Sequence, residues 1–372
     1  MQRSKKSLKV PIMFILLGIM TGSTVQSKAI AILSQKVSIK PTSTLVAPTA
    51  VIHEATPTQS QRTRILFTGD INLGRCIAKR TLSAQAGTNN FNYPFQFVAE
   101  ELRASDITVG SMDGSLSDES PSMPCPDSMN LIAPTKMVEG LQLSGFDVMT
   151  IATNHIKDCG EKGFECDNKA LFDTINTLKT AGIQVVGAGN NLQESRLPVI
   201  VERNGIRFAF LGINQIDERV WAGENTPGTA PLSKAYIDKI KAEITSAKQI
   251  ADVVIILPHW GKEYDARPKD IQRVWARDFI SAGASLVIGN HPHIIQPMEI
   301  FSDKLIFYAL GNFIFDQEQD FQRESIVVEV NFNGAEIESW KLHPVSINYY
   351  TMQSHWAEDA DAEGVLARTR GE

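Results

Sequence analysis

Residues Ser285–His293 read Ser-Leu-Val-Ile-Gly-Asn-His-Pro-His, and they carry the strongest structural signal in the chain. The first four residues are typical of a short buried strand, which runs directly into two histidines on either side of a proline. Proline fixes its own φ angle, so His291 and His293 present their imidazoles from one stiff turn. A strand that ends in such side chains is expected where an α/β sheet presents its carboxyl ends to a ligand.

Four other apolar runs end in a similar way. Each is followed within a few positions by an aspartate, an asparagine or a histidine. The pairs are Arg64–Thr68 with Asp70, Ile107–Val109 with Asp113, Asp147–Ala152 with Asn154 and His155, and Val253–Leu257 with His259. Because the carboxyl ends of strands in an open α/β sheet border one crevice, we expect all five strand ends to converge on one pocket.

Segments with a helical period alternate with these strands, so the sequence predicts an α/β (α+β mixed) fold. Helices are expected at Val138–Leu143, Asn168–Thr180 and Lys269–Ser281, each followed closely by a glycine. Asn204-Gly205 and Asn333-Gly334 each separate two apolar runs and predict tight hairpin turns. Antiparallel strand pairs should therefore lie beside the strand–helix units.

The composition is that of a large folded chain. The 372 residues include 42 acidic and 36 basic side chains, a formal net charge of -6, and 43% are hydrophobic. The acidic balance argues against a nucleic-acid binder, which needs a basic face. We expect a Pro/Thr/Ser-rich linker over 30–62, one domain over 63–350, and an acidic tail over 351–372 that frays.

The N-terminus predicts export. Three lysines precede the apolar run Val10–Met20, and small and polar residues follow as far as Ala29. This pattern is typical of a secretory signal peptide over 1–29. Because the run is shorter than the roughly 20 residues that span a bilayer, an uncleaved membrane anchor is the alternative interpretation. In both cases the domain is expected to be extracytoplasmic, either secreted or attached to the membrane.

The four cysteines have no CxxC spacing, which argues against a finger-type zinc site. They are Cys76, Cys125, Cys159 and Cys166. In an exported protein they can form disulfides. The candidate pairs are Cys159 with Cys166, or either of these two with Cys125, and the sequence does not choose between them.

The side chains at the strand ends suit a divalent metal ion. Two carboxylates, one amide and three imidazoles come from Asp70, Asp113, Asn154, His259, His291 and His293. Such oxygen and nitrogen ligands bind Zn²⁺, Mn²⁺ or Fe²⁺, and a carboxylate can bridge two ions about 3.5 to 4 Å apart. Taken singly, Asp70 could be a helix N-cap and Asn154 a turn residue. The five strand ends together favour a metal site.

These motifs resemble those of the CapA-type poly-gamma-glutamate capsule biosynthesis proteins, which have a metallophosphoesterase-like fold. The resemblance extends over about Ile65–Gln317 and rests on Gly69–Arg75, Asn154–Asp158 with Gly160, Gly187–Gly189, His259–Gly261 with Glu263, Gly289–His293 and Phe307–Phe313. It implies a layered sandwich of mixed sheets flanked by helices. It also implies a site in which Asp70 binds a first ion, Asn154 and His259 bind a second, His291 and His293 bind one each, and Asp113 bridges both.

Three positions depart from the family pattern. Ser111-Met112-Asp113 stands where the family has Asn-Leu-Glu, Thr153 replaces a second asparagine, and Asn72 stands where ordinary metallophosphoesterases have a histidine. The first ion site is consequently poor in imidazole. The resemblance therefore implies one or two divalent ions (Mn²⁺, Zn²⁺ or Fe²⁺), with Mg²⁺ as an alternative at the first position.

The resemblance implies a metal-dependent hydrolase that acts on a phosphoester or on an amide of a glutamate polymer. His155 would protonate the leaving group, and Asp158 would orient its ring. The alternative for His155 is that it only positions Asn154. Glu263 could equally lie behind the metal ligands.

Two other functions stay open. The chain could be a non-catalytic accessory component that holds an anionic polymer beside capsule synthesis and export proteins, or a phosphatase of unrelated biology on the same scaffold. In each case Arg75, Lys262 and Arg267 are candidates to hold the anionic substrate, the alternative being solvated surface charge.

Overall fold

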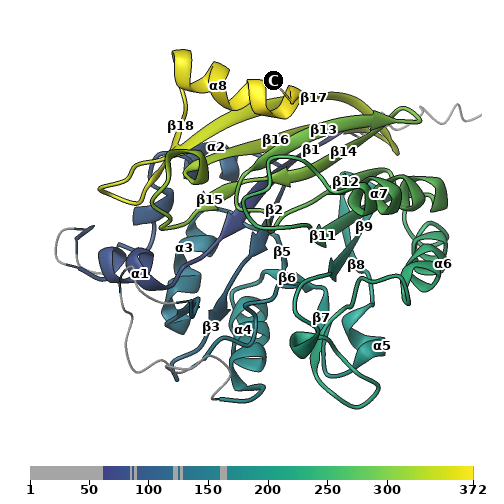
Figure 1. The fold of residues 1–372 in the computed structure, drawn as a ribbon, viewed down its shortest axis with the longest axis horizontal. Coiled ribbons are helices and arrows are strands. Elements are labelled where there is room, and N and C mark those ends of the chain that lie inside the picture. The colour runs from purple at the N-terminus through teal and green to yellow at the C-terminus, as the bar shows by residue number, and fades with distance from the viewer. Residues whose placement is uncertain are drawn as a thin grey trace, which may run out of the picture. The chain divides into compact units, whose positions relative to one another are not determined.

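The computed structural model describes residues 62–83, 86–87, 90–119, 125, 129–159 and 166–371 (Figure 1). The expected signal segment over 1–29 lies outside the described residues, as does the expected linker except for Arg62. No helix within the described ranges is long and apolar enough to cross a membrane.

The larger sheet contains the first three of the five strand ends. Its strands run in the order β18 (Ser354–Trp356), β17 (Glu336–Ile347), β16 (Glu324–Asn333), β1 (Arg62–Ile71), β2 (Ile107–Met112), β5 (Val148–Thr150) and β6 (Gln184–Val186), and β15 (Asn312–Ile314) also pairs with β1. The neighbouring strands β1, β2, β5 and β6 are parallel to one another. Strands β16, β17 and β18 join the sheet antiparallel. The carboxyl ends of β1, β2 and β5 therefore lie side by side.

The second sheet contains the other two strand ends. Its strands run in the order β13 (Ile295–Phe301), β14 (Lys304–Leu310), β12 (Leu286–Ile288), β11 (Val253–His259), β9 (Ile206–Asn214) and β8 (Val199–Arg203). The four inner strands are parallel, and an antiparallel hairpin forms each edge. Two short pairs complete the strands: β3 (Ser115–Leu116) with β4 (Ile132–Ala133), and β7 (Ala188–Gly189) with β10 (Gly228–Thr229).

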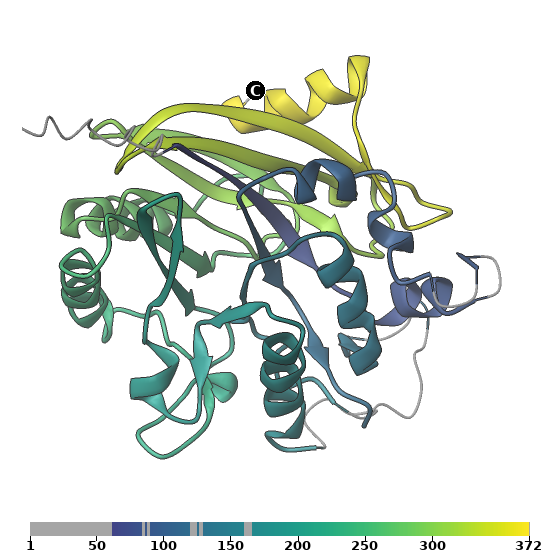
Figure 2. The ribbon, with the colours of Figure 1, turned by 180° about the vertical axis from the view of Figure 1, so that it is seen from behind.

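The two sheets pack on each other, and helices cover their outer faces (Figures 1 and 2). In β1, Ile65 and Phe67 belong to the core between the sheets, whereas Leu66 belongs to the core beneath the first group of helices. This alternation explains why the strand is apolar throughout, because both of its faces are buried. The expected layered sandwich of mixed sheets flanked by helices is confirmed.

The helices fall into groups. The first sheet is covered by α1 (Arg75–Thr81), α2 (Ala99–Arg103), α3 (Val138–Leu143) and α4 (Lys169–Thr180), and the second by α6 (Ile237–Ala247) and α7 (Asp270–Ala282). The short α5 (Leu192–Ser195) and the 3-10 turns η2 (Tyr93–Phe95), η3 (Thr135–Met137), η4 (Glu218–Val220) and η5 (Asp320–Gln322) lie in connections. The three helices expected from the sequence, α3, α4 and α7, are confirmed to within one residue at each end.

Both expected hairpins form. Asn204 and Gly205 have φ angles of 53° and 78° and connect Arg203 to Ile206, which are paired across β8 and β9. Positive φ at both positions is what a type I′ turn requires. The second hairpin turns one residue later than expected, because Asn333 still pairs with Glu336.

The segment 351–372 is expected from the sequence to fray. The structure instead shows it ordered through residue 371. It contributes the edge strand β18 and the helix α8 (Asp359–Arg370). The side chain of Val365 is buried in the core that lies between the sheets. Acidic residues stand in the first turn of α8 and arginines in its last turn, an arrangement that stabilises a helix dipole.

Two disulfides are present. Cys159 pairs with Cys166, which is one of the expected pairings. Cys125, however, pairs with Cys76 in α1 rather than with Cys159 or Cys166. The 49 residues that separate Cys76 from Cys125 explain why sequence spacing did not indicate this pair.

Candidate metal centre

The structure brings all six expected metal ligands together where the strand ends of the two sheets meet. They are Asp70 near the end of β1, Asp113 after β2, Asn154 after β5, His259 at the end of β11, and His291 and His293 after β12. Ligand atoms of Asp70, Asp113 and His293 all lie within 4.8 Å of one another. Side chains from five separate strands thus form a single cluster.

Asp113 lies at the centre of the cluster. Its side chain is fully buried, and neither carboxylate oxygen has a hydrogen-bond partner among the described residues. Its Oδ1 is 3.6 Å from Nε2 of His259, and its Oδ2 is 3.6 Å from Nε2 of His293. Burial of a carboxylate without hydrogen bonds is costly. The residues therefore fit a divalent ion, which would bind these oxygens and the facing imidazole nitrogens.

Asp70 adds a second buried carboxylate. Its Oδ1 accepts a 3.0 Å hydrogen bond from Oγ of Ser111, and its Oδ2 accepts a 2.9 Å hydrogen bond from the backbone N–H of His291. Burial, together with the nearby negative charge of Asp113, raises the pKa of Asp70 well above its usual value. Two carboxylates at such close range favour a cation between them. Ser111 is one of the departures from the family pattern, and its hydroxyl thus holds the carboxylate of the expected ligand Asp70 in place.

The imidazoles have their own contacts. Nε2 of His259 lies 2.8 Å from Oδ1 of Asn154 and 3.2 Å from Nδ1 of His291. Burial lowers the pKa values of His259 and His291 well below their usual value, and the neighbouring imidazoles add to the effect. Both rings are therefore neutral, which is the state that binds a metal.

The backbone of the histidine turn is constrained. His291 and His293 have φ angles of 98° and 58°, which non-glycine residues rarely adopt. Such conformations persist only where the surrounding structure stabilises them. The contacts of His291 with Asp70 and of His293 with Asn312 provide this stabilisation.

His155 lies beside the ligands and faces Asp158, with Nδ1 2.7 Å from Oδ2 of the carboxylate. Burial opposes protonation, but the negative charges of Asp158 and Asp113 prevail and raise the pKa of His155 to about 9. Asp158 is itself held by the backbone N–H of Leu131 at 2.7 Å. The pair can therefore hold a proton next to the cluster.

The three expected substrate-binding cations lie in different settings. The guanidinium of Arg75 pairs with the buried carboxylate of Asp316, with Nε 3.0 and 3.1 Å from its two oxygens. Lys262 is exposed on the connection between β11 and α7. Arg267, on the same connection, lines a cavity of about 780 Å³. Tyr264 forms part of the same wall and lies 6.1 Å from His293, ring centre to ring centre.

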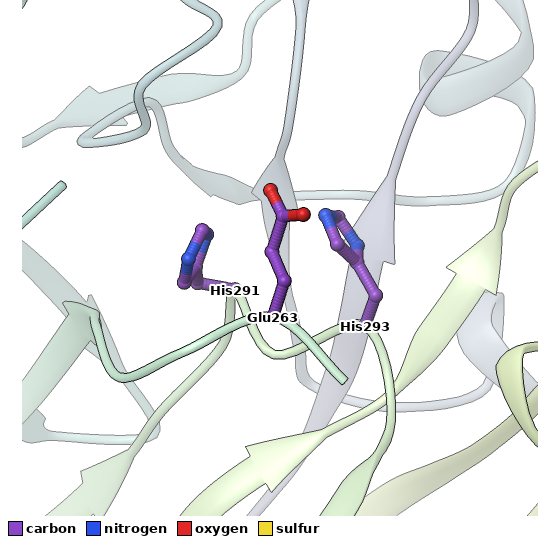
Figure 3. A group of neighbouring side chains, drawn as sticks. All are labelled: Glu263, His291 and His293. Atoms are coloured by element: carbon purple, nitrogen blue, oxygen red, sulfur yellow. The ribbon is translucent and has the colours of Figure 1, made fainter. Parts of the chain in front are cut away.

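The sequence does not define the role of two residues near the cluster. Glu263 extends its carboxylate between His291 and His293 (Figure 3). Oδ1 of Asn312, at the start of β15, lies 2.9 Å from Nδ1 of His293. Both belong to motifs that carry the family resemblance, but a motif does not tell which way a side chain points.

The comparisons with known proteins agree on one family. The model of the family described as bacterial capsule synthesis protein PGA_cap matches residues 64–317. The chain is 31% identical over 287 residues to the PGA biosynthesis protein CapA of Bacillus subtilis (strain 168), covering 77% of this chain and 72% of the relative. It is also 31% identical over 288 residues to the capsule biosynthesis protein CapA of Bacillus anthracis, covering 75% and 66%.

A solved 5'-nucleotidase from Candida albicans is more distant. It aligns with a TM-score of 0.43 and 13% sequence identity, over 83% of this chain and 57% of that chain.

Proposed function

Because the chain belongs to the PGA_cap family of bacterial capsule synthesis proteins, we propose that it is a metal-dependent hydrolase that acts in poly-gamma-glutamate biosynthesis. The observation that carries the proposal is the fully buried carboxylate of Asp113, which accepts no hydrogen bond from the described residues and faces two imidazole nitrogens at 3.6 Å. A purely structural aspartate in this position would be strongly destabilising. The binding of one or two divalent ions in the cluster would explain why this carboxylate is buried.

Each part of the site has a task in this proposal. A bound divalent ion lowers the pKa of a water molecule and stabilises negative charge in the transition state. Asp70, Asp113 and the neutral imidazoles would hold the ion. Nδ1 of His155 faces Asp158, so Nε2 is the atom that delivers a proton to the leaving group. Asp158 orients the ring and favours its protonated form.

A second candidate function, a non-catalytic accessory role in polymer binding, is favoured by the cavity beside the cluster. Four arginines line it, Arg267, Arg273, Arg368 and Arg370, and none of its described lining residues is acidic, although Arg273, Arg368 and Arg370 pair with Glu299, Glu324 and Glu363 outside the lining. Ile294 and Ile295, which directly follow His293, form part of its wall. A chain of carboxylates such as poly-gamma-glutamate has the complementary charge. The same cavity would also serve a hydrolase by holding the polymer next to the ion.

The proposal includes export. The sequence over 1–29 predicts a signal peptide or membrane anchor, and two disulfides join all four cysteines. Disulfides persist mainly in oxidising compartments. Fractionation of the producing cells should find the protein outside the cytoplasm with no free thiol. Full-length cytosolic protein with four free thiols would contradict this part of the proposal.

The decisive experiment compares the wild-type chain with the double variant His291→Ala/His293→Ala. Each is assayed on poly-gamma-glutamate, a phosphodiester and a phosphomonoester, with Mn²⁺ and with Zn²⁺. We expect the wild type to bind the ion and cleave one of these substrates, and the double variant to lose both the ion, by elemental analysis, and turnover. Equal metal content in both proteins would disprove the site.

Polymer binding separates the two candidates. If no substrate is cleaved but metal-loaded wild type retains poly-gamma-glutamate, the accessory function is correct. Arg267→Gln/Arg273→Gln should weaken polymer binding in both cases, because it removes two positive charges from the cavity. Arg207→Gln is the matched control, since Arg207 is an exposed arginine paired with Asp252 where β9 and β11 begin, at the end of the strands opposite the cluster.

A further inference from the structure

Glu263 is a half-buried carboxylate that has no hydrogen bond and no ion pair in the described part of the chain. It follows β11 by four residues, after a turn in which Gly261 has a φ of 91°. The backbone N–H of the next residue, Tyr264, donates a 2.9 Å hydrogen bond to the carbonyl of Pro292. This bond holds the segment of Glu263 against the turn that carries His291 and His293.

The side chain of Glu263 points into the cluster. Ligand atoms of Glu263, His291 and His293 lie within 4.8 Å of one another, and Figure 3 shows the carboxylate between the two rings. Two atoms bonded to one ion at about 2.1 Å are at most roughly 4.2 Å apart. Small side-chain rotations are therefore enough to place all three groups on a metal ion.

The ion next to His293 needs another ligand. Asp70, Asp113 and His293 supply three residues, whereas transition ions in proteins take four or more ligands. Asn72, two residues beyond Asp70, does not supply a fourth. Its Oδ1 accepts a 2.8 Å hydrogen bond from the N–H of Gly74, and its Nδ2 is directed at Asp316.

The hydrogen bond of His293 also limits which metal ions it can bind. Its Nδ1 is engaged with Asn312, so only Nε2 can bind a metal. The group with Asp70 and Asp113 and the group with Glu263 and His291 both include His293, and a single nitrogen cannot serve two ions. If both groups bind metal, they therefore share one ion, and His291 comes to it together with Glu263.

We propose that Glu263 is a direct ligand of this ion and completes a site of three carboxylates and two imidazoles with Asp70, Asp113, His291 and His293. The inference rests on the proposed function in that it assumes a divalent ion in the cluster. Such an oxygen-rich set suits Mn²⁺ better than Zn²⁺. The remaining candidate ligands, Asn154 and His259, lie together, with Oδ1 of Asn154 2.8 Å from Nε2 of His259.

The test is Glu263→Gln in the full chain, read by metal binding rather than by activity. Titration with Mn²⁺ should show affinity reduced by at least about 10-fold, since even groups behind the ligands contribute that much. With Co²⁺ as a probe, the visible absorption bands should change, because the ligand set changes. Glu263→Asp keeps the charge and should recover part of the affinity.

Asp265→Asn is the matched control, because it removes a carboxylate from the same segment that is paired with Lys269 instead. It should leave Mn²⁺ affinity and the Co²⁺ spectrum unchanged. If Glu263→Gln has the wild-type affinity and spectrum, Glu263 is not a ligand, although the metal site stands. If the wild type itself binds no ion, the proposed function fails first.

Discussion

Nδ1 of His293 donates a hydrogen bond to Oδ1 of Asn312, at 2.9 Å. An amide oxygen can only accept, so Nδ1 carries the hydrogen and the lone pair of Nε2 faces Asp113. Asn312 is held in turn, because its Nδ2 donates to the carbonyls of Gln322 at 2.8 Å and of His293 at 3.3 Å. An asparagine from β15 thus sets the orientation of a histidine from the loop between β12 and β13.

Asn312→Ala should therefore weaken metal binding without removing a ligand. We expect the dissociation constant for Mn²⁺ or Zn²⁺ to rise about 10- to 100-fold, the usual effect of losing a group that orients a ligand. Calorimetric titration measures this, and a melting curve checks that the variant is folded. Asn312→Asp keeps the acceptor and should lose less affinity. An unchanged dissociation constant in a folded Asn312→Ala variant would show that His293 needs no orienting partner.

His155→Gln should separate chemistry from metal binding. If His155 is the proton donor, turnover should fall by about 10²- to 10⁴-fold, the usual contribution of acid catalysis, while the metal content stays that of the wild type. Asp113→Asn should instead lose metal and turnover together. Asp158→Asn should reduce turnover less than His155→Gln, because it removes the 2.7 Å partner of the ring but not the proton donor. Full turnover in His155→Gln would rule out the acid role.

Glu329, which lies outside the metal site, should make the free energy of unfolding depend on pH. Burial opposes its ionised form, but hydrogen bonds from Arg64, Asn331 and His343 lower the pKa of Glu329 to about 2. Because this folded value lies below that of an unfolded glutamate, the stabilisation is present above about pH 4.5 and is lost as the pH falls toward 2. Between pH 7 and pH 3, the advantage of wild type over Glu329→Gln in unfolding free energy should shrink by about 2 kcal/mol. A constant difference in urea unfolding would contradict this pKa.

The two disulfides should differ in their contribution to stability. Cys76 and Cys125 close a loop across 49 residues, whereas Cys159 and Cys166 are seven apart. A longer loop loses more unfolded-state entropy, so Cys76→Ser/Cys125→Ser should reduce the unfolding free energy by about 4 kcal/mol, against about 2.5 kcal/mol for Cys159→Ser/Cys166→Ser. Urea unfolding of the oxidised proteins measures both. The reverse order would show that native contacts outweigh loop entropy here.

The five strand ends, the flanking helices and the first hairpin were all predictable from the sequence. Each depends on local patterns, such as β-branched runs, a helical period or an Asn-Gly turn, which involve residues close together in the chain. The chemistry of the cluster was also predictable, because aspartates, histidines and an asparagine in those positions suggest a metal whatever their final geometry.

The tertiary structure decided which residues meet. Asp70 and His291 are 221 positions apart, and His259 and Asn154 are 105 apart, so their contacts depend on how the two sheets pack. The same holds for the Cys76–Cys125 disulfide, for Arg75 turning toward Asp316, and for α8, which is ordered because Val365 reaches the core. Glu263 shows the limit most clearly. A hydrogen bond between Tyr264 and Pro292 holds its segment against the histidine turn, and such a contact between two loops leaves no periodic signal in the sequence.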